Sequence, residues 1–176
     1  TSCGFSAFRQ IEASGKLPTL DTRRHTLKEQ TLPDTMHGLL AVAIADAKAI
    51  SRRKYQPHFG YWHCPLDNGK CLVCLAGSII ARSLNSPSTA MIRPSFLSPG
   101  VQRKMDAINA MRHGNWQYAY HLIYNSAPDC STLDSLLFLP TPAQCDFIGW
   151  RQFGAHLKSL QRILPKLRAL EKQSRS

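Results

Sequence analysis

Long apolar runs are missing from this chain of 176 residues and no signal peptide is visible in it, while the missing initial Met leaves open that N-terminal residues were removed. The longest uninterrupted apolar run covers residues 39–45, far short of the roughly 20 residues that a membrane-spanning helix requires. The first ten residues show no charged segment followed by an apolar one, which a signal peptide would need. We therefore expect no membrane partner and a cytoplasmic protein.

Acidic residues are also scarce, with 11 Asp and Glu against 22 Lys and Arg. The resulting net charge of +11 favours an anionic partner, either nucleic acid or an acidic protein surface, and says nothing about the fold. The charge is uneven along the chain. Residues 151–176 hold seven basic residues and a single acid, Glu171, which together supply +6 of the +11.

Length and composition are typical of one globular domain, since 43% of the residues are hydrophobic. We expect a single helical domain over residues 34–176 with a basic C-terminal helix. Residues 1–33 are weakly patterned and form an N-terminal arm, with mobile and ordered states both open. The six cysteines are spread along a chain with an ordinary core, which favours reduced, buried thiols over a disulfide scaffold.

The stretch from Tyr61 to Asn85 concentrates the unusual residues, and we expect the fold to be organised around it. Its Asp67-Asn68-Gly69 segment is typical of a tight turn, so we predict a β-hairpin near residues 58–74. From Cys71 to Leu84 apolar residues recur at helical spacing, and Asn85 with Pro87 closes the run. This pattern predicts a buried helix that follows the turn.

Capping residues and apolar stripes predict further helices, and hence a mainly α (α+β) fold. One helix starts at Asp34 or Thr35 and runs to about Lys54, ending in Arg52-Arg53-Lys54. A helical hairpin covers residues 98–125, starting at Ser98-Pro99. A last helix follows a capping box at 141–144; Pro165 should kink it, and its core-facing residues would be Trp150, Phe153, Leu157, Leu160, Leu164 and Leu167.

Three cysteines and a histidine fall within twelve residues, at positions with metal-ligand spacing. Cys64, Cys71, Cys74 and the adjacent His63 could supply the four soft ligands of a zinc site. However, apolar residues surround the Cys71-x2-Cys74 pair, and there is no second pair of this kind. We expect no metal, with buried thiols as the alternative role for these residues.

The same segment is similar to a catalytic signature. Residues 68–76 resemble the sequence around the nucleophile of papain-like cysteine proteases, which would make Cys74 the nucleophile. The match departs at the oxyanion position, Asn68, and at the aromatic position, Leu75. Only 102 residues follow Cys74, fewer than the roughly 130–150 that usually separate the nucleophile from its histidine. We expect no catalytic residues, no cofactor and no enzymatic activity.

Basic residues are the main candidates for partner binding. The last helix contributes a basic face opposite its apolar seam, and two basic clusters lie earlier in the chain. The candidates are Arg151, Lys158, Arg162, Lys166, Arg23, Arg24, Arg52, Arg53 and Lys54. They could neutralise phosphates or contact an acidic protein, whereas the alternative is a solvated helix face. The chain has no zinc-finger, RRM or KH signature.

Three blocks carry a resemblance to a protein group. Trp62-His63, the segment 71–78 with its following helix, and residues 104–114 look like small uncharacterised proteins of bacteriophages and related mobile elements. That resemblance covers about residues 60–115 and implies that only Cys74 is typical of the group. It carries no agreed activity, and it implies an accessory protein in the cytoplasm of a bacterial host.

We therefore expect an interaction protein that binds and modulates, as an inhibitor, a host protein or nucleoprotein complex such as a defence system. Binding would use the basic surface. The alternative is direct DNA or RNA binding, and a third hypothesis is a cysteine hydrolase. The oligomeric state stays open.

Overall fold

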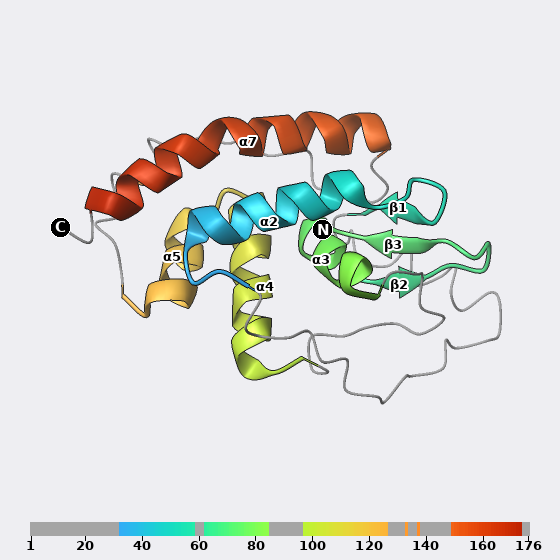
Figure 1. The fold of residues 1–176 in the computed structure, drawn as a ribbon, viewed down its shortest axis with the longest axis horizontal. Helices are drawn as coiled ribbons and strands as arrows, with labels where there is room; N and C mark the ends of the chain where they lie inside the picture. Colours follow the sequence, from blue (N-terminus) through green and yellow to red (C-terminus); the bar gives the residue numbers. More distant parts are fainter. Residues whose placement is uncertain are drawn as a thin grey trace, which may run out of the picture.

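A computed structural model describes residues 32–58, 62–84, 97–126, 133, 137 and 149–173. Within these ranges it contains five helices and one three-stranded sheet, so the predicted mainly α (α+β) class is confirmed (Figure 1). The elements are α2 (Met36–Ala49), β1 (Tyr55–Pro57), β2 (Cys64–Pro65), β3 (Cys71–Val73), α3 (Leu75–Leu84), α4 (Pro99–Arg112), α5 (Trp116–Tyr124) and α7 (Trp150–Gln173). The predicted N-terminal arm, apart from residues 32 and 33, lies outside the described residues.

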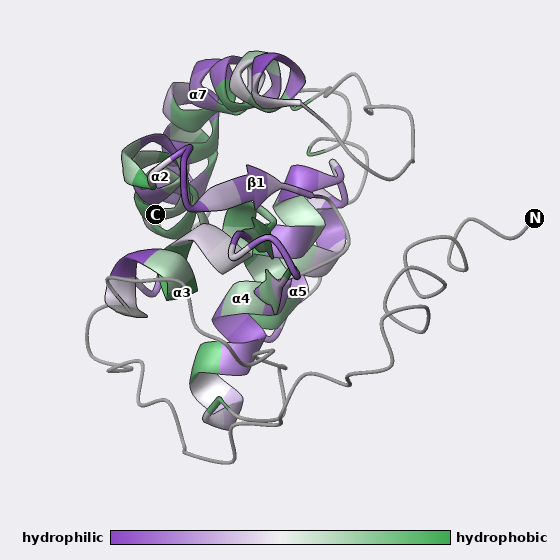
Figure 2. Ribbon diagram, turned by 90° about the vertical axis from the view of Figure 1, so that its right-hand side faces the viewer, coloured by the Kyte–Doolittle hydropathy of each residue, from purple (hydrophilic) through white to green (hydrophobic). Residues whose placement is uncertain are grey.

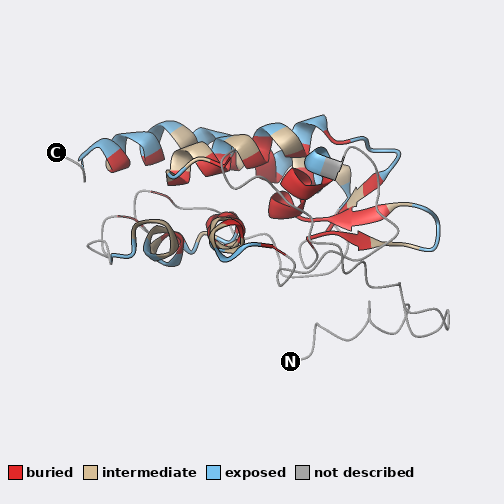
Figure 3. Cartoon of the chain, turned by 60° about the horizontal axis from the view of Figure 1, so that its bottom comes forward, coloured by how far each residue is buried: buried red, intermediate tan, exposed pale blue. Residues whose placement is uncertain are grey.

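Helix α2 is the centre of the fold, because it contacts each of the other four described helices. Helix α7 runs along one side of α2, and the α4–α5 pair forms a second layer beneath them (Figures 1 and 3). The sheet lies at one end, next to α3. We expected residues 61–85 to organise the fold; α3 is buried, but the residues with the widest set of contacts belong to α2.

The N-terminus of α2 is capped from two directions. Of the two predicted N-caps, Asp34 and Thr35, the structure has Thr35, whose hydroxyl accepts a hydrogen bond from the Gly38 N–H at 3.2 Å. The preceding two N–H groups, of Met36 and His37, donate to the carboxylate of Glu171 at 2.7 and 3.2 Å. All of the first three N–H groups of α2 therefore have acceptors, two of them supplied by a residue more than 130 positions away.

Glu171 lies on α7 and is buried, with 4% of its surface exposed. Besides the two backbone donors, it contacts the hydroxyl of Tyr124 on α5 and the Nδ1 atom of His37. A carboxylate at a helix N-terminus is also favoured by the helix dipole. We call this arrangement the Glu171 clamp, since it joins α2, α5 and α7 at one point.

The end of α2 differs from the prediction. The helix ends at Ala49, and Ile50 already has an extended backbone (φ −68°, ψ 146°). The prediction that the helix continues to Lys54 was wrong. The chain has to be extended where residues 55–57 pair with β3, and the Lys54 C=O already accepts the Cys71 N–H at 3.0 Å. The basic triplet Arg52–Lys54 therefore does not lie in the last helical turn.

The sheet has the strand order β1-β3-β2. Strands β2 and β3 are antiparallel and joined by a turn in which Gly69 has a φ of +77°, so the predicted hairpin is confirmed. Strand β1 pairs with β3 in parallel, with Tyr55 opposite Cys71. The sequence did not indicate β1, because its three residues follow the apolar stripe of α2 without a clear change of pattern.

Helix α3 starts at Leu75, four residues after the point where the helical pattern begins. The correction has a physical reason: residues 71–73 are fully buried in the central strand, and a strand buried on both faces is also continuously apolar. In the first turn of α3, Gly77 lies directly against the backbone of Trp62, and a Cβ atom at this position would overlap the Trp62 carbonyl oxygen. Only glycine permits this close approach.

The helical hairpin is confirmed. Ser98 caps α4, with Pro99 in its first turn, and Asn115 caps α5. Val101, Met105, Ile108 and Met111 recur at helical spacing on α4, and all four are buried. Arg112, the last residue of α4, is buried as well, with 3% of its surface exposed.

Helix α7 packs its apolar seam on α2 and the core. The seam contains Phe153, Leu157, Leu160, Ile163 and Leu167, with Trp150 and Leu164 half-buried. Pro165 lies inside the helix, and Figure 1 shows α7 bending toward its C-terminal end. The capping box at 141–144 lies outside the described residues. Among the helices described, none combines the length and apolar composition that crossing a bilayer requires.

Candidate functional site

Four basic side chains form one stripe on the outer face of α7. Arg151, Lys158, Arg162 and Lys166 are all exposed, and their spacing of seven, four and four residues keeps them on one side of the helix. We call these four residues the α7 ridge. It is about 22 Å long at the 1.5 Å rise per residue of a helix. Figure 3 shows the exposed outer edge of α7 opposite the buried edge that faces α2.

No acidic group neutralises the ridge among the described residues. None of its four side chains forms an ion pair there, and the pairs present are His37–Glu171, Arg82–Asp46 and Lys104–Asp34. The acid within α7 itself is Glu171, which is buried in the clamp. Figure 2 shows the same separation, with hydrophilic residues on the outer turns of α7 and hydrophobic ones toward α2. The ridge is therefore a stripe of uncompensated positive charge.

The basic triplet lies next to the start of the ridge. The guanidinium of Arg52 sits 5.4 Å from the centre of the Trp150 ring, at the first residue of α7. Arg53 and Lys54 are exposed beside it. The structure thus brings together two of the three basic clusters that the sequence indicated. The third, Arg23 and Arg24, lies outside the described residues.

A groove of about 560 Å³ opens between α2 and α7 near the other end of the ridge. Leu164, Pro165, Ala41 and Ala169 supply apolar walls, and the basic or titratable residues are His37, Arg168 and Lys172. We call it the α2–α7 groove. The sequence could not have revealed it, because its two walls come from segments more than 120 residues apart.

The cysteine segment does not form a ligand cluster. Cys64, Cys71 and Cys74 are reduced thiols and are all buried. Cys74 belongs to the main core, whereas Cys71 packs in a separate small cluster with Tyr55, Val73 and others. Within the described ranges, no group of three His, Cys, Asp or Glu side chains is arranged to hold a metal ion. The zinc hypothesis for His63 and these cysteines thus gains no geometric support.

Cys74 acts as a helix cap. It precedes the first residue of α3, and its sulfur accepts a hydrogen bond from the Gly77 N–H at 3.3 Å. Burial raises the pKa of its thiol, although the charge of Arg112 and hydrogen bonds from the backbone N–H groups oppose this shift. A nucleophilic cysteine requires the opposite conditions, namely access and a lowered pKa. The geometry therefore gives Cys74 a structural role.

Arg112 is the functional-looking residue that sequence reasoning missed. Its side chain is buried near Cys74 and contacts the Nε2 atom of His113. Burial, and after it the charge of Arg112, lower the pKa of His113 and bring that of His156 to about 4. Arg112 ends a helix in sequence and in structure, so no sequence signal separates it from an exposed capping cation.

No family model, no curated protein and no solved structure matches this chain.

Proposed function

We propose that this protein binds an acidic surface of a partner protein through the α7 ridge and modulates that partner. The ridge carries the proposal, because four exposed cations that have no ion-pair partner in the described part of the chain face away from the core. Their charge contributes nothing to packing. In the context that the sequence resemblance implies, the protein would be a phage or mobile-element accessory protein that inhibits a complex in the bacterial cytoplasm, such as a defence system.

The α2–α7 groove favours a protein partner over nucleic acid. It lies beside the last ridge residue, Lys166, and combines apolar walls with the cations Arg168 and Lys172. Protein interfaces place an apolar or aromatic anchor in such a pocket, surrounded by a polar rim. Phosphate binding needs cations alone and has no use for walls such as Leu164 and Pro165.

The spacing of the ridge cations also suits a contact at the edge of the interface that attracts the partner before it binds. Ridge cations lie about 6–10 Å apart along the helix axis, comparable to the screening length of about 8 Å at physiological salt. Their attraction to an acidic surface therefore acts mainly on the association rate and weakens with added salt. The affinity of the complex would come from side chains of the partner protein that bind in the α2–α7 groove.

A matched pair of charge reversals tests the proposal. Lys158→Glu with Arg162→Glu changes the ridge, and Lys70→Glu with Arg103→Glu makes the same charge change elsewhere on the surface. We expect the ridge variant to fold normally and to lose a partner that the unmutated protein captures from bacterial lysate. The control variant should retain that partner.

Nuclease treatment separates the two kinds of anionic partner. Capture that survives nuclease and depends on the ridge supports the protein partner. Capture lost on nuclease treatment, with a log–log salt slope that falls by about 0.9 per removed phosphate contact, assigns the ridge to direct nucleic-acid binding. Equal capture by both charge-reversal variants would leave the ridge as a solvated helix face.

A further inference from the structure

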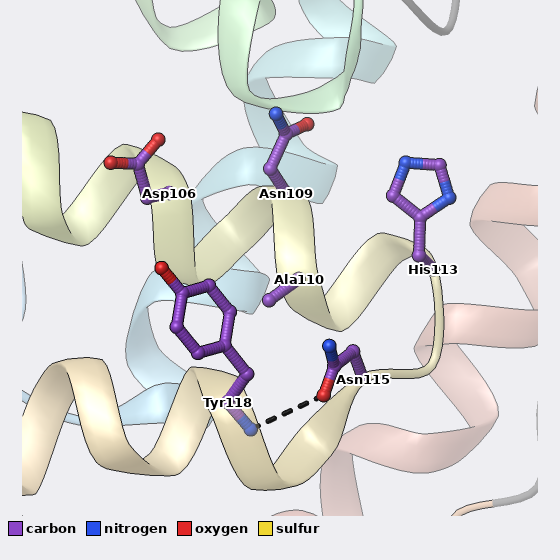
Figure 4. A pocket seen from close by; sticks show the side chains of 6 residues that line it. All are labelled: Asp106, Asn109, Ala110, His113, Asn115 and Tyr118. Carbon is purple, nitrogen blue, oxygen red and sulfur yellow. Dashed lines mark hydrogen bonds between the residues drawn. The ribbon is translucent and has the colours of Figure 1, made fainter.

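A polar pocket of about 320 Å³ lies on the α4–α5 hairpin, away from the basic ridge in sequence and on different helices. Asp106, Asn109, Ala110 and His113 line it from α4, and Asn115 and Tyr118 line it from the start of α5. Figure 4 shows the Tyr118 ring rising from α5 toward the side of α4 that carries Asp106. Its volume is at the lower end of the range for small-molecule sites.

Two hydrogen-bond acceptors on this stretch of α4 have no donor among the described residues, and of the two only the Asp106 carboxylate is open to a ligand. The Asn109 Oδ1 atom is buried and makes no hydrogen bond. The Asp106 carboxylate is half-buried and likewise has no hydrogen-bond or ion-pair partner within the described ranges. Because they are three residues apart on α4, the two side chains lie on the same face of the helix. Buried acceptors of this kind are normally satisfied.

Two other polar residues of the pocket already have partners. Asn115 accepts the Tyr118 N–H through its Oδ1 atom at 3.3 Å, which caps α5. His113 contacts the guanidinium of Arg112. Since Asp106 and His113 are two helical turns apart, about 10 Å along the axis, the pocket has a carboxylate at one end and the His113 imidazole at the other.

Electrostatics distinguish the same two ends. Burial raises the pKa of Asp106, and no neighbouring cation opposes that shift. The pKa of His113, in contrast, is lowered by burial and by the charge of Arg112. A positively charged ligand would therefore be drawn to the carboxylate end of the pocket.

We propose that the Asp106 end of this pocket binds a guanidinium group. A guanidinium presents planar N–H donors that pair with a carboxylate in bidentate fashion. Tyr118, 51% exposed, offers a ring face for the cation or its alkyl stem. The group is supplied by a free small molecule or by an arginine side chain of a partner. This site is independent of the ridge proposal.

Two probes distinguish the sources of the guanidinium. Agmatine represents the free small molecule, and an acetylated, amidated Gly-Gly-Arg-Gly-Gly peptide represents an arginine side chain. We expect both to shift the amide signals of residues 106–118 of ¹⁵N-labelled protein. Tighter binding of agmatine assigns the site to a small molecule, and tighter binding of the peptide assigns it to a protein partner. Putrescine, which has the same chain with an ammonium in place of the guanidinium, should bind more weakly than agmatine.

Two substitutions with the same loss of charge test the residues. Asp106→Asn should weaken agmatine binding about tenfold or more, since a charged hydrogen-bond pair is lost. Asp67→Asn, in the exposed hairpin turn, should leave binding unchanged. The urea midpoint of Asp106→Asn should equal or exceed that of the unmutated protein, because its carboxylate has no partner to lose. Absence of shifts at 106–118 with either probe, or equal effects of the two substitutions, would overturn the proposal.

Discussion

Removing the carboxylate of Glu171 should be among the most damaging single changes outside the apolar core. Glu171→Ala deprives the Met36 and His37 N–H groups and the Tyr124 hydroxyl of their acceptor. Met36 is fully buried, so its N–H cannot turn to water instead. Each buried donor left without a partner costs about 1–3 kcal/mol.

The Tyr124 hydroxyl limits that cost. It already accepts a long hydrogen bond from the Met36 N–H, at 3.4 Å between nitrogen and oxygen, and remains an acceptor once the carboxylate is gone. We therefore expect Glu171→Ala to reduce the free energy of unfolding by about 3–5 kcal/mol, the range for breaking a buried charged network. Glu171→Gln keeps one acceptor oxygen and should cost about 1–2 kcal/mol. For a domain with a total stability of about 5–15 kcal/mol, the alanine variant would be severely weakened.

Urea unfolding followed by circular dichroism measures these differences, with Gln173→Ala as the control. Gln173 is exposed in the same last turn of α7, so its substitution should change stability by no more than about 0.5 kcal/mol. A double-mutant cycle of Tyr124→Phe with Glu171→Gln should give a coupling of about 0.5–3 kcal/mol. A cost below about 1 kcal/mol for Glu171→Ala, or one equal to that of the control, would refute the clamp.

Two further predictions concern packing and pH. Gly77→Ala should destabilise by about 3 kcal/mol or more, because the new methyl group would meet the backbone of Trp62; Gly154→Ala, in open space on α7, should be neutral or stabilising by up to about 1 kcal/mol. Thermal unfolding of both variants checks this, and equal melting temperatures would contradict it. Burial and the charge of Arg112 lower the pKa of His156 to about 4, so the unfolded chain takes up this proton before the folded one does. Stability should therefore fall as the pH drops from about 6.5 to 4, by on the order of 2–3 kcal/mol, and in His156→Gln this part of the acid sensitivity should disappear from urea titrations.

Local signals predicted most of the helices correctly. The caps at Thr35, Ser98 and Asn115 each begin a helix, because a side-chain oxygen close in sequence satisfies the first N–H groups. The face of α7 that carries the ridge also followed from spacing alone, since a helix fixes which residues share a side. These features depend on neighbours within one or two turns.

Features that depend on distant contacts were not predictable in this way. Strand β1 forms only because β3 offers a free edge to pair with, and this pairing ends α2 five residues early. The burial of Arg112 and the Glu171 clamp likewise arise from helices that meet in space. In sequence, Glu171 is only the lone acid of a basic tail, although it is the residue that anchors α7 to α2.

In the candidate site, too, features that depend on local spacing were predictable and features that depend on distant contacts were not. Exposure of the ridge could be inferred from the apolar seam on the opposite side of α7. Its junction with Arg52 through the Trp150 ring could not, because the two residues belong to elements almost 100 positions apart. The α4–α5 pocket was also hidden, since Asp106 and Tyr118 look in sequence like ordinary surface residues of two helices.

The two prolines of the sheet have a consequence for how this protein can meet other chains. Both edge strands carry one, since the order is β1-β3-β2. On β1, the Lys54 C=O and the His58 N–H form hydrogen bonds with β3. The backbone N–H and C=O groups of residues 55 and 57 therefore point away from β3, toward the open edge of the sheet. The Tyr55 N–H is already donated to the Ser51 C=O at 2.9 Å, and Pro57 has no N–H to offer.

Strand β2 is closed in the same manner. The Leu66 N–H bonds inward to the Lys70 C=O at 2.7 Å, so the residue before it, Pro65, occupies the outward position and again lacks a donor. An extended segment from another molecule would find no backbone donor along either strand, and such edges resist both aggregation and strand addition. Among the described residues, the sheet therefore offers a partner no backbone donor for its extension.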